Sequence, residues 1–174
     1  IHNPAMKFAR ECGMQLISIS RTLYKEKNID DVLMSLPDLQ EYLIVPEGGS
    51  GEEGMYGLAN LSEELPEDAD LIVTACGTGT TLAGLINVKN RKYHGVGISV
   101  LKGRDTLTPY VQSLSSYEDF EIISGYHFGG YGRKTEELIS FAKSFTHSSK
   151  IPLDFVYTAK MVYAFDDLLR KGYF

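Results

Sequence analysis

Residues 70–85 read DLIVTACGTGTTLAGL, and this stretch decides the fold. Its first half is a short apolar run, which ends in glycines and threonines and passes directly into residues spaced as in a helix. A parallel strand that is covered on both faces is apolar along its length, and a tight turn commonly leads from it into a helix. The stretch therefore predicts one strand–turn–helix unit of an α/β protein.

Similar units follow one another along the chain. The expected strands are residues 14–20, 42–45, 71–77, 93–100 and 120–124. The expected helices are residues 3–13, 30–41, 52–65, 80–88, 107–114 and 135–145, with a last helix that carries the apolar stripe Val156, Met161, Phe165 and Leu168. This alternation predicts an α/β fold with a mostly parallel sheet flanked by helices in three layers. Since the first helix begins in mid-pattern and no strand follows the last, we expect residues 1–174 to be a single partial unit, incomplete at both ends.

Charge and composition exclude some classes of partner. The chain carries 17 basic and 23 acidic residues, a net charge of −6, whereas nucleic acid and anionic membranes attract basic surfaces. No apolar run approaches the roughly 18 residues of a membrane span. The two cysteines, Cys12 and Cys76, have no zinc-ligand spacing, so no metal site is expected. We therefore expect a cytoplasmic protein whose ligand is a small molecule.

The turn CGTGTT, residues 76–81, has the features of an anion-binding loop. In a parallel sheet it lies at the carboxyl end of a strand, where ligands bind. Gly77 and Gly79 allow the backbone to approach an anion, and amides and hydroxyls from Thr78 to Thr81 can donate to phosphate oxygens. The loop lacks the lysine of a GxxxxGK[ST] nucleotide loop, so nucleotide binding is not favoured. A tight turn whose threonines only cap the helix stays open as an alternative.

Three segments together resemble one enzyme family. They are IVPEGGSGEEGMYGL at residues 44–58, CGTGTTLAGL at residues 76–85 and IPLDFVYTAKMVYAF at residues 151–165. Their order and spacing are similar to those of the ACC (1-aminocyclopropane-1-carboxylate) deaminase and D-cysteine desulfhydrase family, and residues 3–21 also resemble it. Members are pyridoxal 5'-phosphate (PLP) enzymes with the tryptophan synthase β-like fold, called fold type II. The resemblance implies that residues 1–174 are mostly the larger, PLP-binding domain and that the protein is a homodimer.

The resemblance also implies roles for individual residues. The cradle of the PLP phosphate would consist of Gly77, Thr78, Gly79, Thr80 and Thr81. Tyr157 matches the family tyrosine beside the cofactor that handles a substrate proton or amino group, and Tyr131 matches a second tyrosine at the substrate mouth. Thr158 matches the position facing the pyridine nitrogen, where ACC deaminases carry glutamate and D-cysteine desulfhydrases threonine. A hydroxyl there permits a neutral ring suited to β-elimination.

The activity implied by the resemblance is that of a PLP-dependent lyase or deaminase. It would act on a small amino acid, by β-elimination from a D-cysteine-like substrate or by opening a cyclopropane ring. Such enzymes hold PLP as a Schiff base on a lysine, which in this family lies in a glycine-asparagine-lysine context that residues 1–174 do not contain. We therefore expect the chain alone to be inactive and the lysine to belong to a preceding segment.

Two alternatives to this activity stay open. One is a non-catalytic phospho-ligand-binding module that has kept the fold, and the other is a relative that binds a different phosphorylated cofactor. Without the family context, Tyr157 could be a core aromatic and Tyr131 a surface residue of a glycine-rich loop.

Overall fold

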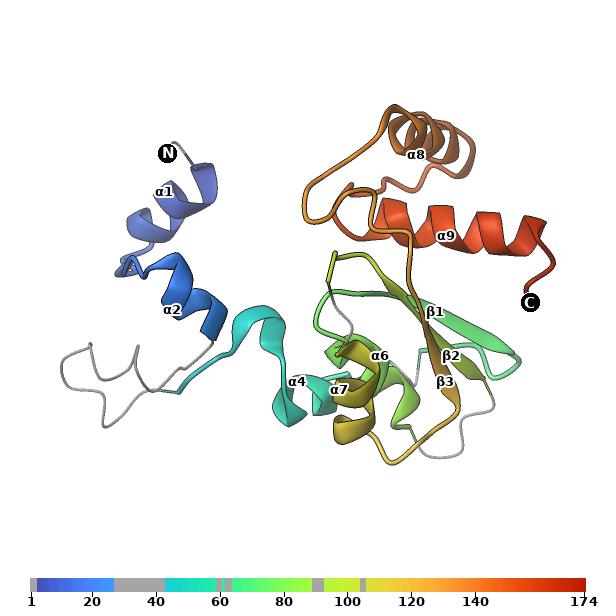
Figure 1. Cartoon of the computed structure of the whole chain (residues 1–174), viewed down its shortest axis with the longest axis horizontal. Helices are drawn as coiled ribbons and strands as arrows, with labels where there is room; N and C mark the ends of the chain where they lie inside the picture. The colour runs from blue at the N-terminus through green and yellow to red at the C-terminus, as the bar shows by residue number, and fades with distance from the viewer. Residues whose placement is uncertain (1–2, 27–42, 59–60, 62–63, 89–92, 104–105) are drawn as a thin grey trace. The chain divides into compact units, whose positions relative to one another are not determined.

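The computed structural model of the chain, drawn in Figure 1, divides it into two units, Ile1–Ile44 and Val45–Phe174. It describes residues 3–26, 43–58, 61, 64–88, 93–103 and 106–174. The helix predicted over residues 30–41 lies outside the described residues.

The smaller unit contains two short helices, α1 (Pro4–Glu11) and α2 (Arg21–Glu26). Asn3 caps α1, because its side chain accepts a 3.0 Å hydrogen bond from the Ala5 amide. The helix predicted over residues 3–13 is confirmed, and it ends two residues earlier than expected.

The strand predicted over residues 14–20 is wrong. These residues lie between α1 and α2 in neither helix nor strand, and Met14 and Ile17 are 62% and 49% exposed. A strand exists through hydrogen bonds to a neighbouring strand, and the described residues of this unit include no strand for residues 14–20 to pair with. The apolar pattern of residues 14–20 is typical of a strand, but the described residues of this unit offer no second strand to pair with it.

The larger unit is built on a sheet of three strands. In spatial order they are β1 (Leu71–Cys76), β2 (His94–Ser99) and β3 (Phe120–Ile123). All pairs are parallel: Val73 of β1 is opposite Val96 of β2, and Val96 is opposite Glu121 of β3. A helix lies between successive strands, as parallel pairing requires (Figure 1). The predicted parallel α/β sheet is therefore confirmed, with three of the five expected strands.

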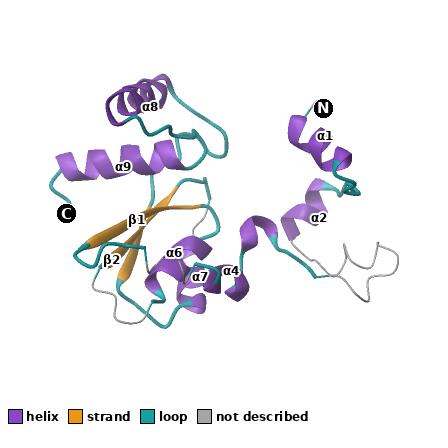
Figure 2. Cartoon of the chain, turned by 180° about the vertical axis from the view of Figure 1, so that it is seen from behind, coloured by secondary structure: helices purple, strands orange, loops and turns teal. Residues whose placement is uncertain are grey.

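Helices cover both faces of this sheet (Figure 2). On one face lie α6 (Thr80–Ile86) and α7 (Leu107–Leu114), and on the other lies α9 (Thr158–Arg170). The predicted arrangement of helices, sheet and helices in three layers is confirmed.

Strand β2 shows how its sequence positions both layers. Val96 and Ile98, together with Val100 just after the strand, are fully buried and pack against α9, whereas Gly95 and Gly97 face α6. A Cβ at Gly97 would lie 2.6 Å from Cys76 Sγ, closer than side-chain packing allows. Glycine in this strand therefore lets α6 pack directly onto the backbone of the sheet.

A further helix, α8 (Glu136–Ser149), packs against α9. Thr135 caps it by accepting a 3.2 Å hydrogen bond from the Leu138 amide. The Tyr163 hydroxyl of α9 donates to Glu137 of α8, and this hydrogen bond raises the pKa of Tyr163 to about 12. The helix predicted over residues 135–145 is confirmed and is one turn longer than expected.

Two predicted elements near the boundary between the two units differ from the structure, and residue 42 of the first lies outside the described residues. Leu43 and Val45, in the strand expected over residues 42–45, are 90% and 74% exposed and lie in an irregular segment. Of the helix expected over residues 52–65, the structure describes α4 (Glu52–Tyr56), which ends with Gly57 as its C-cap, and residue 61 is also helical. Residues 59–60 and 62–63 of this prediction lie outside the described residues. A short 3₁₀ turn, η2 (Glu47–Gly49), precedes α4.

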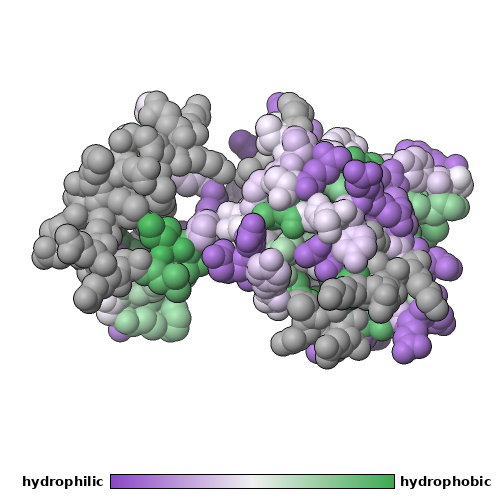
Figure 3. Space-filling view, turned by 90° about the horizontal axis from the view of Figure 1, so that it is seen from below, coloured by the Kyte–Doolittle hydropathy of each residue, from purple (hydrophilic) through white to green (hydrophobic). Residues whose placement is uncertain are grey.

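The surface of the larger unit mixes hydrophilic and apolar residues on the face shown in Figure 3. Among the described helices, none has both the length and the apolar character that crossing a membrane requires.

Candidate functional site

The glycine-threonine loop lies at the carboxyl edge of the sheet, between β1 and α6. Gly79 has a φ of +92° and is the N-cap of α6. A Cβ at this position would lie 2.8 Å from Val111 Cγ2 of α7, so both backbone conformation and packing require glycine. A Cβ at Gly77 would lie 3.1 Å from Cε1 of Tyr157. The Tyr157 ring therefore lies directly against the loop.

The threonines of this loop have unequal exposure. Thr80 is 4% exposed and its Oγ1 lies 3.2 Å from Thr78 Oγ1, whereas Thr81 is exposed. Two hydroxyls so close together, in a glycine loop at the end of a parallel strand, are a donor set that fits a phosphate group. Among the predicted cradle residues, the structure thus joins Thr78 and Thr80 and leaves Thr81 on the surface.

The EGGS segment lies against the same loop. A Cβ at Gly48 would lie 2.9 Å from Thr78 Cγ2, and a Cβ at Gly54 would lie 1.9 Å from the Gly49 carbonyl oxygen and 3.2 Å from Thr80 Cγ2. The glycines of residues 44–58 thus let this segment fold tightly beside the threonines. Sequence reasoning had assigned the segment no role in forming the loop's surroundings.

Asp154 organises the start of α9, where Tyr157 and Thr158 lie. Its carboxylate accepts hydrogen bonds from the amides of Val156 (2.8 Å), Tyr157 (2.8 Å) and Thr158 (3.0 Å). Burial acts to raise the pKa of Asp154, but the hydrogen bonds from Thr158, Tyr157 and Val156 outweigh it and lower that pKa. Asp154 therefore fixes the backbone that carries Tyr157, which is 39% exposed beside Gly77.

The Thr158 hydroxyl is also held by Asp154. It donates to Asp154 Oδ2 over 2.7 Å and accepts from the Asp154 amide over 2.9 Å. In this arrangement the hydroxyl proton is donated to the Asp154 carboxylate that caps α9. The position of Thr158 opposite a pyridine nitrogen stays a prediction.

Tyr131 lies in the loop between β3 and α8 and is 72% exposed. The loop has positive φ angles at Phe128 (50°), Gly129 (93°), Gly130 (114°) and Gly132 (64°). This conformation depends on glycine, and it puts the Gly130 carbonyl in the interior, where Lys160 Nζ donates to it over 2.8 Å.

Lys160 connects this loop to the rest of the candidate site. It is 0% exposed, and its Nζ donates to the carbonyls of Gly130 (2.8 Å) and Val100 (3.2 Å). Burial lowers the pKa of the ammonium, and the charge of Asp154 opposes this effect. Sequence reasoning treated Lys160 as an ordinary helix position. The sequence did carry a signal, because positions 160, 164 and 168 lie on one buried side of α9 and the first of them is a lysine.

The Cys76 thiol and a hollow beside α8 are two further features that could suggest a functional site. Burial raises the pKa of the Cys76 thiol to about 12, so this cysteine is a core residue rather than a nucleophile. An open hollow of about 450 Å³ lies between α8 and residues 152–155, and none of the predicted site residues lines it.

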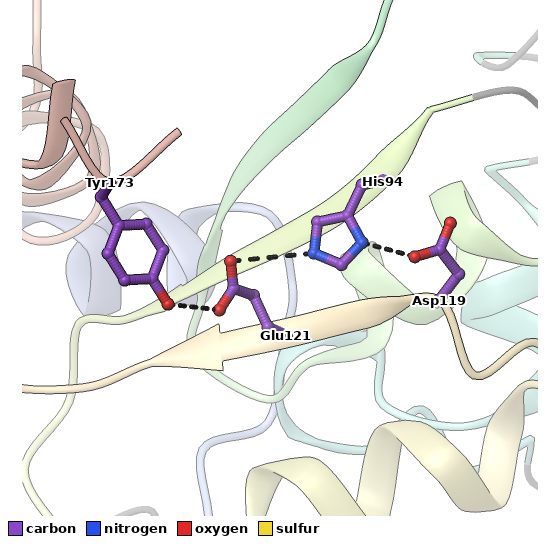
Figure 4. Close-up of polar contacts among 4 residues, drawn as sticks. All are labelled: His94, Asp119, Glu121 and Tyr173. Carbon is purple, nitrogen blue, oxygen red and sulfur yellow. Dashed lines mark hydrogen bonds and ion pairs between the residues drawn. The ribbon is translucent and has the colours of Figure 1, made fainter.

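The opposite, amino-terminal edge of the sheet carries a separate polar cluster (Figure 4). His94 Nδ1 lies 2.6 Å from Asp119 Oδ1, and His94 Nε2 lies 3.7 Å from Glu121 Oε1. The Tyr173 hydroxyl donates to Glu121 Oε2 over 2.7 Å, which ties the end of the chain to β3. These side chains are partly exposed, and none of the predicted site residues is among them.

The fold and the loop together define a class of protein: a parallel α/β protein with a glycine-threonine loop at the carboxyl end of a strand, where proteins of this architecture bind ligands. No family model matches the chain. A Pyrococcus horikoshii protein named as a candidate ACC deaminase is 28% identical over 183 residues, covering 91% of this chain and 56% of that protein. A Thermotoga maritima protein of the same name is 29% identical over 184 residues, covering 92% of this chain and 58% of that protein.

Two further comparisons agree with these. The mitochondrial bifunctional D-cysteine desulfhydrase/ACC deaminase of Arabidopsis thaliana is 29% identical over 149 residues, covering 74% of this chain and 37% of that protein. A crystal structure of an ACC deaminase homologue superposes with a TM-score of 0.77 at 26% identity, covering 95% of this chain and 57% of the homologue.

These comparisons confirm the resemblance to ACC deaminases and D-cysteine desulfhydrases, and they agree with the predicted fold type II. The chain spans just over half the length of the first relatives that it matches, about 56%.

Proposed function

We propose that the protein is a PLP-dependent enzyme that acts on a small amino acid, and that this chain supplies much of its larger, PLP-binding domain. The observation that carries the proposal is the contact between Tyr157 and Gly77, with a virtual Cβ of Gly77 only 3.1 Å from the ring. It brings together the second and third of the segments that resemble the family. The names of the relatives support the same activity.

The residues of the loop fit the phosphate group of PLP. Gly77 and Gly79 allow the backbone to approach a phosphate closely. The hydroxyls of Thr78 and Thr80, 3.2 Å apart, are the side-chain donors that we assign to it. Thr81, although exposed, completes the proposed cradle with its backbone amide. When bound, PLP supplies an electron sink that stabilises negative charge on the α-carbon of an amino acid.

The proposed roles of the other residues concern protons and orientation. Tyr157, with its backbone fixed by Asp154, holds or moves a proton at its phenolic oxygen beside the loop. Tyr131, which is 72% exposed, is assigned to the mouth of the site, where it would bind the substrate. Thr158 is assigned to the ring nitrogen, where a hydroxyl in place of a carboxylate favours β-elimination from a D-cysteine-like substrate over opening of a cyclopropane ring. We further propose a cytoplasmic homodimer.

The experiment is a thermal-shift titration with PLP, using pyridoxal as the ligand that lacks only the phosphate. PLP should raise the melting temperature, and the increase should grow with the logarithm of the PLP concentration above the dissociation constant, because a ligand that binds the folded state stabilises it. Pyridoxal should raise the melting temperature far less. Visible absorption and intact mass after borohydride reduction would show whether a lysine holds the cofactor. A melting temperature that PLP leaves unchanged would overturn the proposal.

A matched pair of substitutions tests the cradle. Thr80→Val removes a buried hydroxyl while keeping the side-chain shape. We expect a loss of PLP affinity of about tenfold to a hundredfold, since a hydrogen bond to a charged group contributes about 1.5–3 kcal/mol. Thr108→Val makes the same change at an exposed position of α7 and should leave the affinity unchanged. If inorganic phosphate stabilises the protein as well as PLP does, and a protein that includes the lysine-bearing segment turns over no amino acid, the protein is a phospho-ligand-binding module instead.

A further inference from the structure

Lys160 is the charged side chain with the least exposure in the described part of the molecule, at 0%. Burying an ammonium is unfavourable unless its hydrogen bonds are replaced. Replacing a buried charge by an apolar side chain of similar volume is often neutral or stabilising. Packing of α9 alone therefore does not explain a lysine at this position. The explanation has to come from the groups to which the Lys160 ammonium donates hydrogen bonds.

The two partners of Lys160 come from different parts of the candidate site. Val100 directly follows β2, at the carboxyl edge of the sheet, and its carbonyl accepts from Nζ over 3.2 Å. Gly130 directly precedes Tyr131, and its carbonyl accepts from Nζ over 2.8 Å. Lys160 itself lies one helical turn after Tyr157. One ammonium thus joins the sheet edge, the loop of Tyr131 and the helix start of Tyr157.

The loop of Tyr131 needs such an attachment. Four of the residues from 128 to 132 have positive φ angles and three of them are glycines, which have the greatest backbone freedom. Within the loop, the Gly130 amide donates to the His127 carbonyl over 2.9 Å and the Arg133 amide donates to the Gly130 carbonyl over 3.1 Å. These are local turn bonds, which do not connect the loop to the sheet. Phe128 packs its ring against Tyr163 of α9, with 5.0 Å between the ring centroids, and the hydrogen bonds of Lys160 connect the loop to the sheet edge.

We propose that Lys160 is a positioning residue of the site: its ammonium fixes the loop of Tyr131 to the carboxyl edge of the sheet and to the helix start that carries Tyr157. The roles of the two tyrosines rest on the proposed function. The geometry that Lys160 maintains is independent of any bound cofactor, so it can be measured without PLP.

The test uses a reporter at position 131. The chain contains no tryptophan, so Tyr131→Trp introduces a unique fluorophore at a position that is 72% exposed. In this background, Lys160→Met removes the ammonium while nearly keeping the side-chain volume, and Lys143→Met makes the same change at an exposed position of α8. Fluorescence anisotropy decay then reports motion of the loop on the nanosecond timescale.

We expect Lys160→Met to increase the amplitude of the fast depolarisation, and Lys143→Met to leave it unchanged. Amide exchange of Gly130 and residue 131 should accelerate about tenfold, which corresponds to the loss of a hydrogen bond to a charged group. Exchange in β1 and β2 should stay the same. Unchanged anisotropy and exchange in Lys160→Met would overturn the proposal.

A second variant covers the case in which Lys160→Met does not fold. Lys160→Gln retains N–H donors without the charge, and the same selective loosening of the loop, to a smaller extent, is expected. If both variants accelerate exchange throughout β1 and β2, Lys160 supports the whole fold and not the two tyrosines, and the proposal is wrong. Failure of the wild-type protein to bind PLP would overturn the proposed function only, because none of these measurements contains PLP.

Discussion

The two edges of one sheet use polar groups in opposite ways. At the carboxyl edge, Thr80 and Lys160 are buried, and Gly77 and Gly79 lie so close to neighbouring side chains that a Cβ would be within 3.1 Å of them. At the amino edge, His94 lies 2.6 Å from Asp119 and 3.7 Å from Glu121, and these side chains are 32–69% exposed.

This difference in burial indicates that side-chain positions are fixed at the carboxyl edge and not at the amino edge. Exposed charged side chains can replace a partner by water at little cost in free energy, so an exposed pair contributes little to holding the two side chains in place. Buried groups have no such exchange, and one displaced atom leaves a polar group without a partner. Three substitutions, in order of expected effect, test whether the two edges differ in this manner.

The first substitution breaks the carboxyl edge at Gly79. Gly79→Ala combines a φ of +92° with a Cβ only 2.8 Å from Val111 Cγ2. Backbone strain of about 1–2 kcal/mol and overpacking of about 1–3 kcal/mol should together lower the free energy of unfolding by about 2–5 kcal/mol. Urea unfolding followed by circular dichroism measures this loss, and PLP binding should be lost with it.

Gly103→Ala is the matched control. Gly103 has a φ of +73°, but a Cβ there would meet no atom within 4 Å. Only the strain of about 1–2 kcal/mol should appear. Equal losses at both positions would show that the contact with Val111 does not matter, and the carboxyl edge would then be no tighter than a surface turn.

The second substitution loosens the start of α9. Asp154→Ala removes the acceptor of three amides and should lower the free energy of unfolding by about 1–2 kcal/mol at neutral pH. The folded-state pKa of Asp154 lies below its usual 3.8, so the carboxylate's contribution is fully present above that pH and is lost as the pH falls through the lowered value. The difference between wild type and Asp154→Ala should therefore shrink in acid, below about pH 3.8.

An acidic residue on the same helix provides the comparison. Asp166 pairs with Arg170 over 3.0 Å at an exposed i,i+4 position, so Asp166→Ala should change the free energy of unfolding by no more than about 0.5 kcal/mol. Should the two alanine variants be equally destabilised at neutral pH, the cap assigned to Asp154 would be wrong.

The parts of this structure that the sequence predicts are those determined locally. Residues 71–86 hold strand, loop and helix signals in one continuous stretch, and each was found in its place. Residues 14–20 carry an equally good strand pattern, yet a strand also requires a partner, and no local pattern states whether one exists.

The candidate site divides in the same way. Gly77 and Gly79 were predicted because a glycine turn after a strand has a local meaning. Lys160 was missed because its bonds reach Gly130 and Val100, 30 and 60 residues away in the sequence. Only the packing of α9 against the sheet brings Lys160 close to these two carbonyls. A lysine among apolar helix positions was nevertheless an indication in the sequence that it is buried.

The third substitution is at the amino edge and should have the smallest effect. Asp119→Asn removes one charge beside His94, 2.6 Å from its Nδ1, at a side chain that is 69% exposed. Surface ion pairs contribute about 0–1 kcal/mol, so the free energy of unfolding should change by less than that, and 1 M salt should remove the difference. Because β2 and β3 keep their register through backbone hydrogen bonds, PLP binding at the other edge should be unchanged. A loss of more than about 2 kcal/mol, or weaker PLP binding, would mean that the amino edge also depends on fixed geometry and that the contrast between the edges does not hold.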